Sequence, residues 1–215
     1  MYMTERMQIL AAISHDLQTP ITRMRLRVDV MDGEPEAAKL RQDLQEMEAL
    51  VKEGVTYART LYGATEVPCR IDPDALFDSL VCDYVDADQQ VSLQGRFGAP
   101  LMTRPQALRR IVGNLVDNAL KFSGAAEINV AAPHDGQTTI RVLDRGPGIP
   151  AESLEAVFQP FFRLEASRNR TTGGTGLGLA IARQLALAMD ATLSLHNRVG
   201  GGLEARLTLR NLRQG

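Results

Sequence analysis

The sequence predicts an α plus α/β protein, in which an antiparallel helical hairpin is followed by a mixed α/β sandwich. In residues 1–61, apolar side chains recur every three or four positions, as they do in amphipathic helices. Beyond residue 70, helix-like and strand-like patterns alternate between glycine-containing turns, which is typical of α/β domains. We therefore expect a helical unit over 1–61, a linker over 62–70 and an α/β unit over 71–215.

The helical unit is predicted to contain two helices, over about residues 4–31 and 35–61. An Asp-Gly pair at 32–33 favours a short turn, and Pro35 suits the first turn of a new helix. Each helix carries an apolar seam that one hairpin cannot bury alone, so we predict a homodimer that forms a four-helix bundle. The seam residues are Leu10, Ile13, Leu17, Ile21, Met24, Val28 and Met31, then Leu40, Leu44, Met47, Val51, Val55, Ala58 and Leu61.

The α/β unit is expected to contain three helices and five strands. Gly63 and Pro68 mark the linker before it, and an Asp-Gly pair at 135–136 predicts a turn between two of the strands. The helices are predicted over 74–86, 105–122 and about 176–189, and the strands over 91–97, 127–131, 138–143, 192–197 and 203–209.

Composition excludes several classes of function. A net charge of -2 gives no support for a nucleic-acid partner. Aromatic residues make up only 5% of the chain and include no tryptophan, which argues against a base-stacking platform. Two cysteines, Cys69 and Cys82, lack metal or redox spacing and suit a reducing compartment. No apolar run approaches the roughly 20 residues of a membrane span, so membrane attachment would require segments outside this chain.

A histidine in the first helix, within "ISHDLQTPI" at 13–21, is a candidate for chemistry. At about 100° per residue, His15 lies nearly opposite the seam, and Thr19 shares its face. Three interpretations are open. An ordinary surface histidine is favoured by this stretch alone. Metal ligation is least favoured, because His134 and His196 offer no ligand spacing. An exposed imidazole could also accept a phosphoryl group, with Asp16 taking a proton.

The segment "NLVDNALKF", residues 114–122, places polar side chains on one helix face. Asn114 and Asn118 are four residues apart, and Lys121 lies close to the same face. Amide oxygens can bind a hard cation such as Mg²⁺, and a lysine suits a polyphosphate. Taken alone, the segment still favours a helix with polar residues turned to solvent.

Two glycine-containing segments follow. In "DRGPGIP", residues 144–150, Asp144 ends a strand and could accept a hydrogen bond from an exocyclic amine such as that of adenine, although a simple turn would look the same. In "TGGTGLGLAIA", residues 172–182, the glycines precede an apolar helix whose N-terminus could bind phosphate. Neither a Walker P-loop nor a Rossmann fingerprint fits that spacing. Residues 157–174 between them suggest a mobile lid.

The order of these segments resembles the catalytic core of the sensor histidine kinases of two-component systems. "ISHDLQTPITRMRL" resembles the H box, "NLVDNALKF" the N box, "DRGPGIP" the first glycine box, "VFQPFFR" the F box and "GGTGLGLAIA" the second glycine box. The resemblance covers nearly the whole chain. It departs from the usual pattern at Gln18, Phe162 and Ala205, and none of these positions removes a chemical group.

The resemblance implies a Bergerat-type ATP-binding fold, with ATP and Mg²⁺ as ligands. His15 matches the phosphoacceptor, Asp16 the neighbouring acid thought to act as base, and Thr19 the residue that assists phosphatase activity. Asn118 matches the residue that binds Mg²⁺. The further positions that it assigns to the ATP site are Asn114, Lys121, Asp144, Gly146, Gly148, Phe158, Phe161, Arg163, Gly174, Thr175, Gly176, Leu177 and Gly178.

The function implied is autophosphorylation of His15 and phosphotransfer to an aspartate of a response regulator, together with phosphatase activity toward that regulator. The resemblance also implies the cytoplasmic part of an inner-membrane sensor, whose membrane segments lie outside this chain. Two alternatives remain at this point. One is an ATP-driven conformational machine like gyrase, although the helix with His15 has no place there. The other is a dimeric docking module with a degenerate ATP site.

Overall fold

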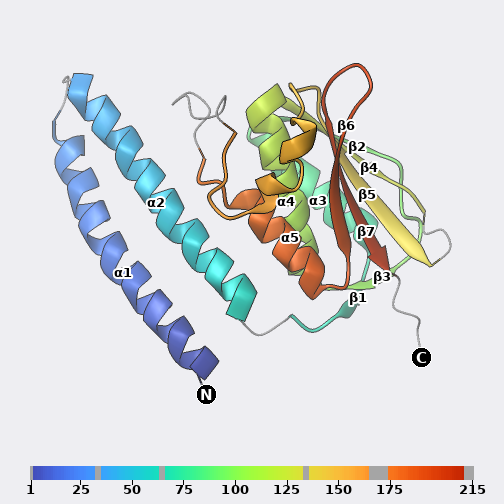
Figure 1. Ribbon diagram of the computed structural model, residues 1–215, viewed down its shortest axis with the longest axis horizontal. Coiled ribbons are helices and arrows are strands. Elements are labelled where there is room, and N and C mark those ends of the chain that lie inside the picture. Colours follow the sequence, from blue (N-terminus) through green and yellow to red (C-terminus); the bar gives the residue numbers. More distant parts are fainter. Residues whose placement is uncertain (1, 32–34, 63–65, 133–135, 165–173, 211–215) are drawn as a thin grey trace.

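The computed structural model describes residues 2–31, 35–62, 66–132, 136–164 and 174–210, with side chains in the first helix described from Asp16 onward. A helical hairpin lies beside an α/β sandwich, and the second helix of the hairpin faces the sandwich (Figure 1). Both parts of the predicted fold class are therefore present in one chain.

The hairpin consists of α1, Tyr2–Asp29, and α2, Pro35–Tyr62. Its antiparallel register is marked by two ion pairs, Arg25 with Glu48 and Arg41 with Asp29, each 3.1 Å long. Between the helices the side chains of the predicted seams meet in a small apolar core. This core contains Ile21, Val28 and Leu44 of the predicted seams, together with Ala37, which was not predicted, and Val51 packs against it.

Other seam residues stay half exposed within the single chain. Leu17 and Met24 of α1 are 46% and 44% exposed, and Leu40 and Met47 of α2 are 43% and 45% exposed. They alternate along the helices with the buried positions, so the hairpin keeps a second apolar stripe. That is the surface a four-helix bundle would cover.

A five-stranded sheet forms one layer of the sandwich, in the order β2-β4-β5-β7-β6. β2 pairs with β4 in parallel, and the remaining neighbours are antiparallel. Three helices cover one face of this sheet (Figure 1). The strands are Gln90–Gln94 (β2), Ala125–Val130 (β4), Gln137–Leu143 (β5), Thr192–Asn197 (β6) and Leu203–Arg210 (β7), and the helices are Pro73–Asp86 (α3), Pro105–Ser123 (α4) and Gly178–Ala188 (α5).

Local chemistry sets the ends of these helices. The Asp72 side chain accepts hydrogen bonds from the N–H groups of Asp74 and Ala75, and so caps α3. α4 ends at Gly124, whose φ of 76° lies in the left-handed region that glycine adopts without strain. α4 is also the most central helix: Leu108, Ile111, Val112 and Val116 are fully buried against the sheet and its neighbours.

Three features differ from the sequence-based expectation. A short second sheet pairs β1, Cys69–Ile71, with β3, Leu101–Thr103, so the predicted linker over 62–70 ends inside a strand. The strand expected over 91–97 ends at Gln94, because Gly95 has a φ of 83° and a Cβ there would lie 2.1 Å from the Val130 carbonyl oxygen. Two short 3₁₀ turns that were not predicted, Ala151–Ser153 and Ala156–Phe158, precede the predicted lid over 157–174, and the second reaches its first two residues. Residues 165–173 of that lid lie outside the described residues. The first residue of the predicted turn at 135–136 lies outside the described residues.

Candidate functional site

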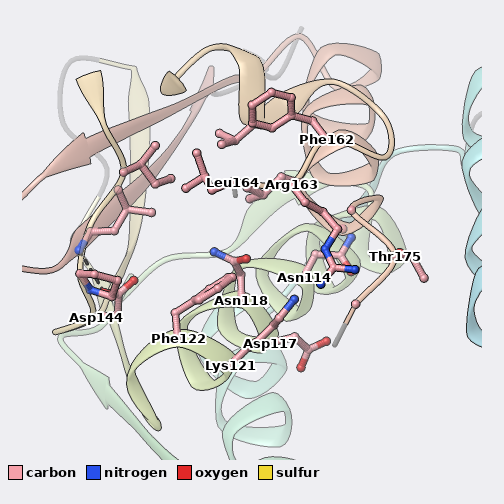
Figure 2. Close-up of a pocket in the computed structure, with 18 of the residues that line it drawn as sticks. Asn114, Asp117, Asn118, Lys121, Phe122, Asp144, Phe162, Arg163, Leu164 and Thr175 are labelled. Atoms are coloured by element: carbon pink, nitrogen blue, oxygen red, sulfur yellow. Dashed lines mark hydrogen bonds between the residues drawn. The ribbon is translucent and has the colours of Figure 1, made fainter. Parts of the chain in front are cut away.

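A cavity of about 870 Å³ lies between α4, the loop after β5 and the loop that leads into α5. Figure 2 shows Asp144 at one end of it and Asn114, Arg163 and Thr175 toward the other, with Asn118 between them. The volume falls in the range of small-molecule sites, and the polar groups are few and separated along its length.

One wall of the cavity is a polar face of α4. Asn114, Asn118 and Lys121 all line it, as the spacing of three and four residues requires. The Nδ2 atom of Asn114 is buried with no hydrogen-bond partner in the described part of the chain. Buried amides rarely stay unsatisfied, so this donor is suited to an acceptor group of a ligand.

Asp117 also lines the cavity and is held from behind by α3. The Tyr84 hydroxyl donates a hydrogen bond of 2.6 Å to Asp117 Oδ1 and lies 3.3 Å from the Gly113 carbonyl oxygen. Burial and the bond to the Asp117 carboxylate raise the pKa of Tyr84 well above its usual range. The phenol therefore stays a donor, and it fixes the turn of α4 that carries Asn114 and Asn118.

Asp144 is a carboxylate only 7% exposed, placed where β5 ends. Its Oδ1 accepts hydrogen bonds from two backbone N–H groups, that of Gly146 at 2.8 Å and that of Leu203 at 3.0 Å. These bonds orient the carboxylate at the rim of the cavity. A fixed carboxylate at this position can read a donor such as an exocyclic amine.

The turn between β6 and β7 braces the loop that follows Asp144. Arg198 donates a hydrogen bond of 2.6 Å to the Asp144 carbonyl oxygen, and the Asn197 side chain bonds both the N–H and the C=O of Ile149. Gly202 packs directly on the loop, because a Cβ there would lie 2.1 Å from the Asp144 carbonyl oxygen. These bracing residues were not predicted, since their role depends on contacts between distant segments.

The loop before α5 closes the cavity with backbone and small side chains. Gly174, Thr175, Gly176 and Gly178 line it, and α5 begins without a side-chain cap. A Cβ at Gly174 would lie 2.5 Å from Lys121 Nζ, and a Cβ at Gly176 would lie 2.9 Å from the backbone of Phe161. An uncapped helix N-terminus beside a cation favours an anionic ligand.

Besides Asp144, the charged residues that line the cavity are two cations, Lys121 and Arg163, and two carboxylates, Glu53 and Asp117. Burial lowers the pKa of Lys121, and the nearby Arg163 guanidinium lowers it further, whereas Glu53 of α2 opposes the shift. Burial also lowers the pKa of Arg110, and Glu53 again acts in the other direction. The ammonium and guanidinium groups here are thus partly desolvated, which strengthens their attraction for a polyphosphate.

Most residues that the sequence assigned to the site meet in this cavity. Asn114, Asn118, Lys121, Asp144, Gly148, Arg163, Gly174, Thr175, Gly176 and Gly178 line it. Gly146 and Leu177 support the two loops instead, the first through its bond to Asp144 and the second as a fully buried residue. Two F-box residues lie outside the lining. Phe158 is buried beneath the Arg183 guanidinium, and Phe161 is 60% exposed.

The histidine region belongs to α1. His15 lies within this helix, but its side chain is outside the described residues, so its predicted solvent-facing position stays a prediction. Asp16 and Thr19 are exposed. The cavity wall also includes Glu53 of α2, which sequence reasoning missed because nothing in the spacing of α2 indicates a partner in the α/β unit.

The described residues contain neither a metal-binding cluster nor a membrane-spanning helix. Within the described ranges, no three His, Cys, Asp or Glu side chains are clustered so that they could hold a metal ion. A cation at this site would therefore need ligand oxygens in addition to the amide of Asn118. Among the same residues, no helix combines the length and the apolar character needed to cross a membrane.

Comparison with known proteins agrees with the geometry. The profile of the histidine kinase-, DNA gyrase B- and HSP90-like ATPase family matches residues 103–213. The chain is 40% identical over 213 residues to the sensor histidine kinase GtrS of Pseudomonas aeruginosa, covering 98% of the chain and 43% of GtrS. It is 35% identical over 205 residues to the sensor protein RstB of Escherichia coli K12, covering 91% of the chain and 46% of RstB. The chain thus spans less than half the length of these curated relatives.

Two solved structures share the fold. Full-length ShkA, solved in complex with AMPPNP, gives a TM-score of 0.73 at 22% identity and covers 95% of this chain and 46% of the ShkA chain. The histidine kinase AdeS of Acinetobacter baumannii gives a TM-score of 0.65 at 22% identity, covering 92% of this chain and 98% of that one. Both alignments include the hairpin as well as the sandwich.

These findings establish the class of the protein. Because the profile covers more than half of the sequence, the chain belongs to the histidine kinase-, DNA gyrase B- and HSP90-like ATPase family. The similarity to sensor histidine kinases continues through the hairpin. Over the hairpin and the sandwich together, the chain is therefore similar to the catalytic core of sensor histidine kinases.

Proposed function

We propose that this chain transfers the γ-phosphoryl group of ATP to a ring nitrogen of His15, and then passes it to an aspartate of a separate response regulator. In the first step an N–P bond forms on His15 while the bond from the γ-phosphorus to the bridging oxygen breaks and ADP leaves. In the second step the N–P bond breaks as the aspartate oxygen attacks. Positioning and charge neutralisation supply most of the catalysis in such transfers.

One observation carries this proposal: α2 of the hairpin forms part of the wall of the ATP cavity. Glu53 lines that wall, so the cavity lies against the helical unit that contains His15. The ion pairs of the hairpin set its antiparallel register, and continuing that register brings Glu53 near the level of His15. Because α2 lies between α1 and the α/β unit (Figure 1), the α/β unit would have to leave its position on α2 to bring a γ-phosphoryl group to the histidine.

The residues of the cavity have separate tasks in this proposal. Asp144 accepts the adenine amine at one end. At the other end Lys121, Arg163 and the N-terminus of α5 bind the phosphates. Asn114 supplies its unpartnered buried amide as a further donor. When Mg²⁺ is bound through the Asn118 oxygen, it neutralises charge on the transferring phosphoryl group.

The hairpin supplies the acceptor chemistry. Asp16, exposed and next to His15, favours the tautomer whose free nitrogen faces the phosphorus and takes up the released proton. Thr19, one turn further along α1, places a water for hydrolysis of the phosphorylated regulator. We further propose that the chain acts as a homodimer, and that it is the cytoplasmic part of an inner-membrane sensor.

An autophosphorylation assay with ATP labelled at the γ-phosphate tests the central claim. The wild type should take up acid-labile label, and His15→Gln should take up none. His196→Gln is the matched control, because His196 is exposed on β6 and bonds only Ser194 among the described contacts. Equal labelling of His15→Gln and the wild type would refute the proposal.

A further inference from the structure

The side chain of Glu53 lies at the cationic end of the cavity, although it belongs to the hairpin. The Thr175 hydroxyl donates a hydrogen bond to Glu53 Oε2, and it also accepts one of 3.2 Å from the Leu177 N–H. Thr175 is thereby held between α2 and the start of α5. Among the described residues of the loop before α5, Thr175 is the one that brings a hydroxyl to the cavity, and Glu53 accepts its hydrogen bond.

Glu53 also compensates the charges around it. It is the carboxylate that raises the pKa of Lys121 and of Arg110 against the lowering effect of their burial. Lys121 Nζ lies against Gly174, directly beside Thr175 in sequence. One carboxylate thus interacts with two cations and a hydroxyl, which are the kinds of group that bind a phosphate.

The rest of α2 fits this arrangement. Tyr57 lies four residues after Glu53, on the same helix face, and lines a second groove with Phe158 and Arg183. The face of α2 that carries Glu53 is therefore the face packed on the α/β unit, and α5 is the element that it contacts.

We propose that the Glu53 carboxylate competes with the nucleotide polyphosphate for the cationic end of the cavity, so that nucleotide binding and detachment of the α/β unit from α2 are coupled. Glu53 already accepts the hydrogen bond of the Thr175 hydroxyl in the cavity that Lys121 also lines, so a triphosphate bound at this end would compete for that hydroxyl and would be repelled by the carboxylate. Binding of the triphosphate releases the α/β unit to approach His15, and its departure restores the contact. This inference rests on the proposed nucleotide site and adds a residue of the hairpin to it.

Nucleotide titrations by calorimetry test the competition, using the complete 215-residue chain. Glu53→Gln removes the charge but keeps an oxygen that can accept the Thr175 bond. It should tighten ATP binding by ~3–10-fold, since the closed form no longer competes. The gain should be smaller for ADP and absent for adenosine, which carries no phosphate. A role in packing alone would change all three affinities alike.

Two companion variants serve as controls, and two outcomes would overturn the proposal. Glu53→Asp keeps the charge and should restore the wild-type ratio of ATP to adenosine affinity. Glu46→Gln removes an exposed carboxylate of the same helix, bonded only to Gln42 in the described contacts, and should change no affinity. Weaker or unchanged ATP binding by Glu53→Gln would overturn the competition while leaving the proposed function intact. Failure of the wild type to bind ATP would overturn both.

Discussion

At the scale of single residues, Asp144 shows how one carboxylate can serve the fold and the ligand at once. Its Oδ1 accepts hydrogen bonds from the N–H groups of Gly146 and Leu203; the first shapes the loop after β5, and the second ties the end of β5 to β7. The lone pairs of the carboxylate that these two bonds leave unused can therefore accept a hydrogen bond from a ligand amine. A carboxylate has enough lone pairs for both tasks, whereas an amide has an acceptor at only one of its two ends.

Substitutions of Asp144 should separate these tasks. Asp144→Asn can keep its oxygen on the two backbone N–H groups, but it then presents an NH₂ group to the adenine amine. We expect ATP affinity to fall by about 10–100-fold, the effect of losing one charge-assisted hydrogen bond, with little change in melting temperature. Asp144→Ala should lose both ATP affinity and stability, because it leaves two buried donors unpaired. Calorimetry and thermal melts distinguish the two, and an Asn variant that binds ATP normally would contradict the assignment.

At the scale of elements, the turn between β6 and β7 acts as a support for the binding loop rather than as a simple connection. Gly200, Gly201 and Gly202 all have positive φ, between 87° and 100°. They differ in surroundings: a Cβ at Gly200 or Gly201 meets open space, while one at Gly202 would overlap the Asp144 carbonyl oxygen. The three glycines therefore allow backbone strain and steric clash to be tested separately.

We expect Gly202→Ala to destabilise the protein by more than ~3 kcal/mol, because clash is added to the strain of a left-handed conformation. It should also weaken ATP binding, since the displaced backbone is that of Asp144. Gly201→Ala carries the strain alone and should cost about 1–2 kcal/mol with ATP affinity preserved. Urea unfolding and nucleotide titration check both variants. Equal effects of the two substitutions would show that the close approach of Gly202 to Asp144 is unimportant.

The elements also show what sequence patterns can predict. α4 was predicted to within one residue, because proline starts it, glycine ends it, and its apolar spacing is regular. The polar face with Asn114, Asn118 and Lys121 followed from that helix geometry. β6 was likewise predicted with its observed limits. Helical and strand periods are local properties, and they place side chains reliably on one face or the other.

What the sequence could not predict depends on contacts between distant segments. The sheet of β1 with β3 joins strands of only three residues each, too short to show a period. Asn197 looks like the end of a strand and Arg198 like an ordinary turn residue until the fold brings them against Ile149 and Asp144. Glu53 is one of many acidic residues on a helix surface, and only its packing against the loop at Thr175 distinguishes it.

At the scale of the whole molecule, the hairpin has three surfaces, each with a different partner. One face of α2 contacts the α/β unit through α5, and the inner seam packs α1 on α2. The remaining stripe, with Leu17, Met24 and Met47 near half exposure, faces no other part of the described chain closely enough to be buried. An apolar stripe along two adjacent helices suits a second hairpin better than it suits water.

This stripe makes the dimer testable without reference to catalysis. Met47→Glu places a charge in the proposed four-helix bundle, once in each copy. Burying an unpaired carboxylate is strongly unfavourable, so the dimer dissociation constant should rise by at least about 100-fold.

Met47→Leu keeps volume and apolarity and should remain dimeric. Val199→Glu, at a fully exposed position in the turn between β6 and β7, controls for added charge. Sedimentation equilibrium gives the mass directly. A monomeric wild type, or a Met47→Glu variant as dimeric as Met47→Leu, would mean that the stripe is not the dimer interface.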